Sequence, residues 1–187
     1  MKMKNILKWS GSALISLLVF VLIRTFTFGE DVTNVKSVPL LEIDETAFAE
    51  RFSGGLRIPT VAYTDRSKMN PKAFETFHSY LEKNYPKAHR FLSREIIGDL
   101  SLLYIWEGTN PSLNPVLLMA HMDVVPVTDA SVDDWTYGPF KGDVADGYIW
   151  GRGAMDDKAS LFSIMEAVEW LLSEGFTPER TIYISFG

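Results

Sequence analysis

The residues best suited to chemistry lie in two short segments of the C-terminal half of the chain. His121 and Asp123 directly follow a run of apolar residues, and Asp156 and Asp157 are adjacent, shortly after Gly153. Imidazole and carboxylate side chains are the ligands that zinc takes in proteins that use no thiolates. If the two segments end at the same edge of a sheet, they can share a divalent cation.

The spacing within each segment leaves more than one role open. His121 and Asp123 lie two residues apart, so on an extended strand their side chains point to the same face. Asp123 can then accept a hydrogen bond from the imidazole and fix its tautomer, or contact a metal-bound water. One carboxylate of the adjacent pair Asp156 and Asp157 can bridge two metal ions through its two oxygens, and one of the pair is expected to cap the helix that begins at Lys158.

The elements around these segments predict an α/β fold. Residues 115–120 form a continuous apolar run, typical of a strand covered on both faces. Residues 158–174 carry a helical apolar stripe that ends at Gly175, and 181–186 read as another buried strand. Strand, helix and strand in this order imply a crossover and a mostly parallel sheet flanked by helices.

The upstream half supplies further elements but no clear site. The expected elements are a helix at 44–52 that ends at 53–55, an extended piece at 56–61, a helix at 70–84, strands at 91–97 and 100–106, and a hairpin at 142–150. His78 and His89 fall on the second helix and in the loop after it, and we expect neither to bind a metal.

The N-terminus predicts a membrane segment. Residues 9–23 contain no charge, and residues 1–30 carry four basic residues and one acidic residue, a net charge of +3. The positive-inside rule then places the rest of the chain outside the cytoplasm, in a periplasmic, extracellular or lumenal space. An uncleaved anchor at 1–29, followed by a tether at 30–43, is favoured over a cleaved signal peptide and a secreted protein, because 25–28 lacks small residues for cleavage.

Composition narrows the class of partner. The 187 residues have a net charge of -6, so the part after residue 30 carries -9. An acidic body argues against binding to nucleic acid. The chain contains no cysteine, which excludes disulfides and thiolate ligands but is compatible with any compartment.

Several segments in the same order resemble the M20 metallopeptidase family, closest to its carboxypeptidase S and N-acyl-amino-acid hydrolase branch. The segments are L-R-I-P-T-V at 56–61, L-L-M-A-H-M-D-V-V-P at 117–126, W-x-x-x-P-F at 135–140, D-G-x-I-W-G-R-G-A-M-D-D-K at 146–158 and E-A-V-E-x-L-L-x-x-G-F-x-P-x-R-T-I-Y-I-S-F-G at 166–187. By this resemblance, residues 44–187 are the N-terminal part of a zinc-exopeptidase-like catalytic domain.

The resemblance implies a role for each site residue. His121 would bind one of two zinc ions, Asp156 would bridge both, and Asp123 would be the catalytic-site carboxylate that orients His121. The peptide bond between Asp156 and Asp157 would be cis. Three further residues would pack around the site: Trp135, Arg152 and Lys158.

The implied activity is zinc-dependent hydrolysis of an amide bond in peptides or N-acyl amino acids, of the carboxypeptidase type, by attack of a metal-bound water. The family's general-base Glu, its other ligands and its lid domain, through which a homodimer could form, would follow Gly187. The 187 residues alone are therefore expected to be inactive. Two alternatives stay open: a non-catalytic membrane-tethered remnant, and an amidohydrolase of the aminoacylase or desuccinylase type.

Overall fold

The computed structural model describes residues 3–28 and 42–187, with side chains described from residue 9 onward. The chain divides into two compact units, Met1–Glu42 and Ile43–Gly187. The predicted tether at 30–43 lies almost wholly outside the described residues, so it stays a prediction.

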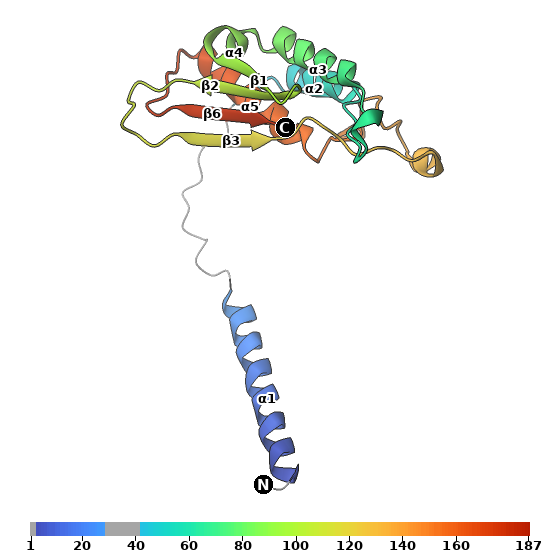
Figure 1. Ribbon diagram of the computed structural model, residues 1–187, viewed down its shortest axis with the longest axis vertical. Helices are drawn as coiled ribbons and strands as arrows, with labels where there is room; N and C mark the ends of the chain where they lie inside the picture. Colours follow the sequence, from blue (N-terminus) through green and yellow to red (C-terminus); the bar gives the residue numbers. More distant parts are fainter. Residues whose placement is uncertain (1–2, 29–41) are drawn as a thin grey trace. The chain divides into compact units, whose positions relative to one another are not determined.

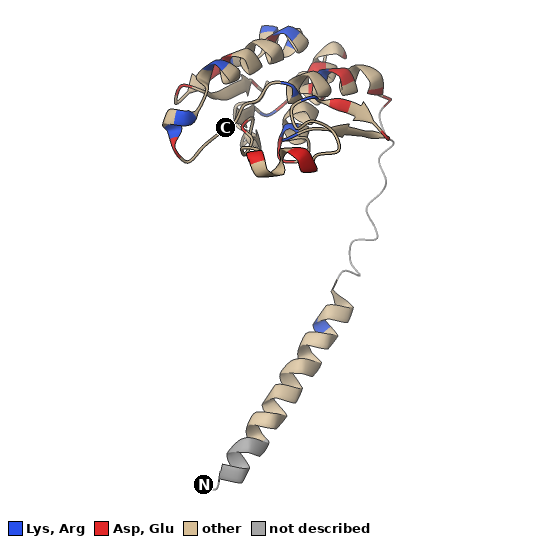
Figure 2. Ribbon diagram, turned by 90° about the vertical axis from the view of Figure 1, so that its right-hand side faces the viewer, with Lys and Arg blue, Asp and Glu red and all other residues tan. Residues whose placement is uncertain are grey.

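The first unit contains one long helix, α1 (Met3–Thr27). Its segment Trp9–Thr27, 19 residues, is long and apolar enough to cross a membrane, and no part of it is buried within the protein. Figure 2 shows how little charge the described part of this helix carries. A signal sequence has the same properties, so the structure leaves anchor and signal peptide as alternatives.

The second unit is built on a four-stranded sheet with the order β1-β2-β6-β3 (Figure 1). The strands are β1 (Ser93–Ile97), β2 (Ser101–Trp106), β3 (Val116–Ala120) and β6 (Ile182–Phe186). β3 and β6 are parallel and are connected through α5 (Lys158–Ser173), as predicted. The pairs β1–β2 and β2–β6 are antiparallel, so the expectation of a mostly parallel sheet is wrong for the described residues.

The reason for the mixed sheet lies in the hairpin. Gly98 and Asp99 both have positive φ, which lets the chain reverse tightly between β1 and β2. The hairpin pairs with the free edge of β6, and β2 runs opposite to it there. An α/β arrangement is confirmed, but the strands that precede the βαβ unit join it in the antiparallel direction.

Of the remaining helices, the first two lie at or near their predicted positions, whereas the third, at 86–91, falls on residues that were predicted to form a loop. They are α2 (Glu45–Leu56), α3 (Pro71–Asn84) and α4 (Pro86–Phe91), with 3₁₀ turns η2 (Arg66–Lys68) and η3 (Asp129–Asp134) and a small hairpin of β4 (Asp143–Ala145) and β5 (Tyr148–Trp150). Asp44 caps α2 by accepting from the N–H of Ala47 at 3.0 Å, and Asn70 caps α3 by accepting from Lys72 at 3.2 Å.

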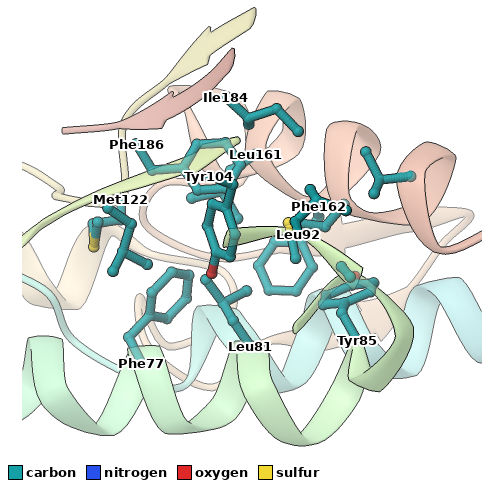
Figure 3. Close-up of a cluster of buried hydrophobic side chains, with 14 of the residues drawn as sticks. Phe77, Leu81, Tyr85, Leu92, Tyr104, Met122, Leu161, Phe162, Ile184 and Phe186 are labelled. Carbon is teal, nitrogen blue, oxygen red and sulfur yellow. The ribbon is translucent and has the colours of Figure 1, made fainter. Parts of the chain in front are cut away.

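The core fills the space between helices and sheet (Figure 3). Phe162 of α5 lies at its centre and packs against four aromatic rings, those of Phe52, Phe77, Tyr80 and Tyr85. The predicted apolar stripe of α5 is confirmed, because Leu161, Met165 and Val168 are buried with it. This packing fixes where α5 begins, and with it the position of the acidic pair just before the helix.

β3 differs from its prediction as a strand covered on both faces. It lies at the edge of the sheet, and Leu117 and Met119 are 55% and 68% exposed. Even on the opposite face, Leu118 is 36% exposed. In the described part of the chain the helices cover one face of the sheet, and both edge strands, β1 and β3, are largely exposed. The apolar run therefore identified a strand correctly but not its burial.

α2 also differs, because it continues through Gly54 and Gly55, where the sequence predicts its end. A Cβ atom at Gly55 would overlap the ring of Phe162, and one at Gly54 would overlap the hydroxyl end of Tyr80. These glycines therefore allow the helix to approach α5 and α3 closely, and the helix continues to Leu56, with Arg57 as its C-cap.

Gly55→Ala is expected to lower the free energy of unfolding by about 1–3 kcal/mol, because the added methyl group overpacks the core at a ring that cannot move. Gly54→Ala is the comparison, and a smaller loss is expected there, because the overlapping hydroxyl end of Tyr80 is only partly buried and moving it breaks one hydrogen bond, to the carbonyl of Arg51 at 2.7 Å. Urea unfolding followed by circular dichroism measures both. Equal losses, or a gain at Gly55, would contradict this account of the helix end.

Candidate metal centre

The structure brings together the two segments that the sequence singled out. His121 directly follows β3, Asp156 lies in the turn before α5, and His121 Nε2 is 3.1 Å from Asp156 Oδ1. The side chain of Asp156 is 89% exposed and that of His121 is 40% exposed, so a metal ion in solvent can reach both candidate ligand atoms. The sequence expectation that these side chains converge is met in this geometry.

Asp123 lies on the other side of the imidazole. Its Oδ1 is 2.9 Å from His121 Nδ1, and its backbone carbonyl is 3.1 Å from the same nitrogen. The ring therefore has an acceptor at each nitrogen, Asp123 at Nδ1 and Asp156 at Nε2. A proton on Nδ1 leaves the Nε2 lone pair for a cation.

The two acceptors control the protonation of His121. Burial lowers the pKa of the imidazole, but hydrogen bonding to Asp156 and to the Asp123 carbonyl, together with the charges of both carboxylates, raises it above 6.5. In the metal-free protein, a proton on His121 Nε2 thus lies between this nitrogen and Asp156 Oδ1, where a cation would bind. Metal ions and protons are expected to compete there.

The peptide bond between Asp156 and Asp157 is cis, as the resemblance implied. Asp157 occupies the N-cap position of α5, but its side chain makes no capping hydrogen bond, so the expectation that one of the pair caps this helix is wrong. Asp157 Oδ2 instead accepts from the backbone N–H of His121 at 3.2 Å. Neither the spacing nor the motif predicted this contact.

Lys158, the residue after Asp157, anchors the same turn to the end of α2 and the residues after it. Its side chain is buried, and Nζ donates to the carbonyls of Gly55 at 3.0 Å and Ile58 at 2.9 Å. It also lies 4.5 Å from the centre of the Phe77 ring. Burial lowers the pKa of Lys158 to about 7, against the opposing effect of the Asp123 charge. The sequence assigned Lys158 to the surroundings of the site, but not to the segment that it holds.

That segment also holds the other half of the site. The hydroxyl of Thr60 donates to the carbonyl of Met122, and the N–H of Val124 donates to the carbonyl of Thr60 at 2.8 Å. Asp123 is therefore fixed between two residues that are both bonded to Thr60. Thr60 is fully buried and was missed as a site residue, although it lies in the L-R-I-P-T-V motif.

The donors border a hollow of about 190 Å³. Its lining consists of His121, Asp123, Val125 and residues 151–156. The guanidinium of Arg152 lies over the ring of Trp135 at 4.9 Å, and the backbone N–H of Arg152 donates to the carbonyl of Pro139 at 2.6 Å. These contacts pack the 126–140 loop against the glycine turn, which agrees with the packing roles expected for Arg152 and Trp135.

The donor chemistry fits a zinc ion. Two ligand atoms of one tetrahedral zinc ion lie about 3.3 Å apart, close to the 3.1 Å between Nε2 and Oδ1. Within residues 3–28 and 42–187, no group of three or more His, Asp or Glu side chains is arranged to hold a metal ion. The described residues therefore supply two converging donors and the carboxylate behind the imidazole.

The other two histidines serve the fold. His78 Nε2 bonds to the carbonyl of Leu100 at 2.9 Å, and His89 lies between the carbonyl of Tyr85 and the hydroxyl of Tyr104. Burial is the main reason why the pKa of each lies below 6.5. The sequence predicted surface or boundary positions, but His78 is buried and His89 lies in α4 rather than in a loop.

In the metal-free protein, the pKa values of the three histidines should not all shift in the same direction from 6.5. The pKa of His121 is expected above this value and those of His78 and His89 below it, and Asp156→Asn should lower only the first. Imidazole resonances followed by NMR across pH 5–9 measure all three. A His121 pKa that is unchanged by Asp156→Asn would show that the two side chains do not interact.

Comparison with known proteins agrees with the motifs. Residues 117–187 match the family model described as peptidase family M20/M25/M40. The chain is 38% identical to a probable carboxypeptidase S-like 2 of Dictyostelium discoideum (93% of the chain, 35% of the relative). It is 44% identical to carboxypeptidase S of Saccharomyces cerevisiae (74% and 25%), and 34% identical to an N-fatty-acyl-amino acid synthase/hydrolase of Xenopus tropicalis (93% and 35%).

Solved structures agree on the fold. The di-peptidase Dug1p of Saccharomyces cerevisiae matches with a TM-score of 0.55 at 21% identity, over 76% of this chain and 32% of that one. The metallo-carboxypeptidase Sso-CP2 of Sulfolobus solfataricus matches with a TM-score of 0.55 at 17% identity, over 78% and 30%. The chain thus spans about a quarter to a third of the curated relatives described above. Through residues 117–187 and through these relatives, the chain is similar to the M20 peptidases.

Proposed function

We propose that the protein containing these residues is a zinc-dependent hydrolase that cleaves an amide bond in peptides or N-acyl amino acids. The observation that carries this proposal is the 3.1 Å approach of His121 Nε2 to Asp156 Oδ1, with Asp123 behind the imidazole. Imidazole nitrogen and carboxylate oxygen suit zinc, and the similarity to the M20 peptidases supports peptide hydrolysis.

The residues of this chain have distinct tasks in that reaction. His121 and Asp156 would hold zinc, with Asp156 bridging a second ion, and Asp123 would keep the imidazole in the correct tautomer and orientation. Zinc bound there would polarise the scissile carbonyl and lower the pKa of a water molecule. The relatives are longer than this chain. We propose that the general base and the remaining metal ligands lie in a region that corresponds to their additional length.

The substrate class rests on the relatives and on the rim of the hollow. The named relatives are carboxypeptidases and an N-fatty-acyl-amino acid synthase/hydrolase. The substrates that these names indicate share an amide bond next to a free carboxylate. Val125 and Met155 line the hollow and are 61% and 90% exposed. Apolar side chains at the opening favour substrates with an apolar acyl group or side chain over charged ones.

We further propose that α1 anchors the protein in a membrane, with the catalytic unit outside the cytoplasm. The charge of +3 in residues 1–30 and the apolar Trp9–Thr27 segment support this orientation. A homodimer through a lid domain remains a proposal from the family resemblance. The absence of a cleavage-compatible sequence at 25–28 favours the anchor over a signal peptide.

The test is hydrolysis of N-acyl amino acids and of dipeptides by the purified protein that contains these residues together with the region proposed to supply the general base, with release of the free amino acid as the readout. Activity should vanish on treatment with a chelator and return with zinc. His121→Ala and Asp156→Ala should each lower kcat/KM by about 10³-fold or more, since a metal ion supplies several kcal/mol of transition-state stabilisation. Asp129→Ala, an exposed carboxylate on η3, is the control and should leave kcat/KM unchanged.

The alternatives give different outcomes in the same assay. Cleavage of acetylated or succinylated amino acids, but of no peptide, would assign the protein to the aminoacylase or desuccinylase class. Absence of any hydrolysis, together with no thermal shift on addition of zinc, would contradict the proposal and support a non-catalytic, membrane-tethered protein.

A further inference from the structure

The structure assigns to Asp157 the role of a positioning residue for the metal ligands, a proposal that rests on the function proposed above. Asp157 belongs to two parts of the site at once. Its carbonyl accepts from the N–H of Leu161 at 3.2 Å and so starts α5, while its Oδ2 accepts from the N–H of His121 at 3.2 Å. The side chain thus joins the end of β3 to the turn that carries Asp156.

The position of β3 explains why His121 needs this partner. In the parallel ladder, alternate N–H groups point to the neighbouring strand, and those of Val116 and Met122 donate to carbonyls of Thr181 and Gly187. The N–H of His121 has the opposite parity and points away from β6. Since β3 is an edge strand in the described sheet, the ladder offers this donor no acceptor, and Asp157 supplies one.

By bonding to His121, the Asp157 side chain gives up the hydrogen bond with which an N-cap residue would stabilise α5. A helix N-cap aspartate ordinarily accepts from N–H groups of its own first turn, but Asp157 makes no such bond. Its carboxylate instead fixes the backbone of His121, one proposed metal ligand. Asp157 is itself adjacent to Asp156, the other proposed ligand. This sets the separation of His121 and Asp156 before a cation arrives, and the nearby negative charge also favours the cation.

Three variants separate these effects. Asp157→Asn keeps an acceptor oxygen without the charge, Asp157→Ala removes both, and Asp129→Ala removes an exposed charge elsewhere. Zinc affinity is measured by competition with a chromophoric chelator, and thermal unfolding is measured without metal. Loss of a group that orients a ligand typically costs 10- to 100-fold in affinity, so this loss is expected for Asp157→Ala, a smaller one for Asp157→Asn, and none for Asp129→Ala.

A second readout needs no metal. Hydrogen exchange of the His121 amide, measured by NMR on the metal-free protein, should be about tenfold faster or more in Asp157→Ala and closer to normal in Asp157→Asn. Unchanged exchange and a zinc affinity within about twofold of the wild type would overturn the assignment. The assignment would also be overturned if Asp157→Ala and Asp157→Asn lost the same amount of zinc affinity and the same amount of unfolding temperature as each other. That result would indicate a fold defect alone. If the wild type binds no zinc, the proposed function fails, while the exchange result still decides whether Asp157 holds His121.

Discussion

The separation of 3.1 Å between His121 Nε2 and Asp156 Oδ1 is the constraint on which the rest of the structure depends. The two residues are 35 positions apart in sequence and belong to different elements. One follows β3, held by the ladder to β6, and the other precedes α5, held by the aromatic core around Phe162. A shift of about 1 Å in either element would separate the donors, because metal sites tolerate only a few tenths of an ångström.

The stretch Gly55–Thr60, which comprises the end of α2 and the residues after it, makes this constraint possible. Lys158 bonds to Gly55 and Ile58, and Thr60 bonds to both neighbours of Asp123. One short stretch therefore holds the turn before α5 and the loop after β3 at the same time. The L-R-I-P-T-V motif, some sixty residues before His121, therefore supports the site although it contributes no ligand.

Features fixed by local chemistry could be predicted from the sequence. The stripe of α5 with Gly175 behind it, the caps Asp44 and Asn70, and the Asp146–Gly147 turn all lie where expected, since each depends on a few neighbouring residues. His121, Asp123 and Asp156 were also identified from spacing and family resemblance. Their roles as ligands and orienting carboxylate remain proposals, which the geometry supports.

Features decided by packing between distant segments could not be predicted. Gly54 and Gly55 normally end a helix, but here they let α2 approach Tyr80 and Phe162. The apolar run of β3 carries no information on sheet order, so its edge position and exposure were missed.

The acceptor role of Asp157 depends on which N–H groups the β3–β6 ladder leaves unused, and sequence spacing does not reveal that.

The most direct test is a crystal structure of the zinc-loaded protein, with anomalous scattering recorded on both sides of the zinc absorption edge. The account predicts a zinc peak at about 2.0–2.2 Å from both His121 Nε2 and an Asp156 carboxylate oxygen. A zinc peak bound by neither residue, or by only one with the other turned away, would contradict it.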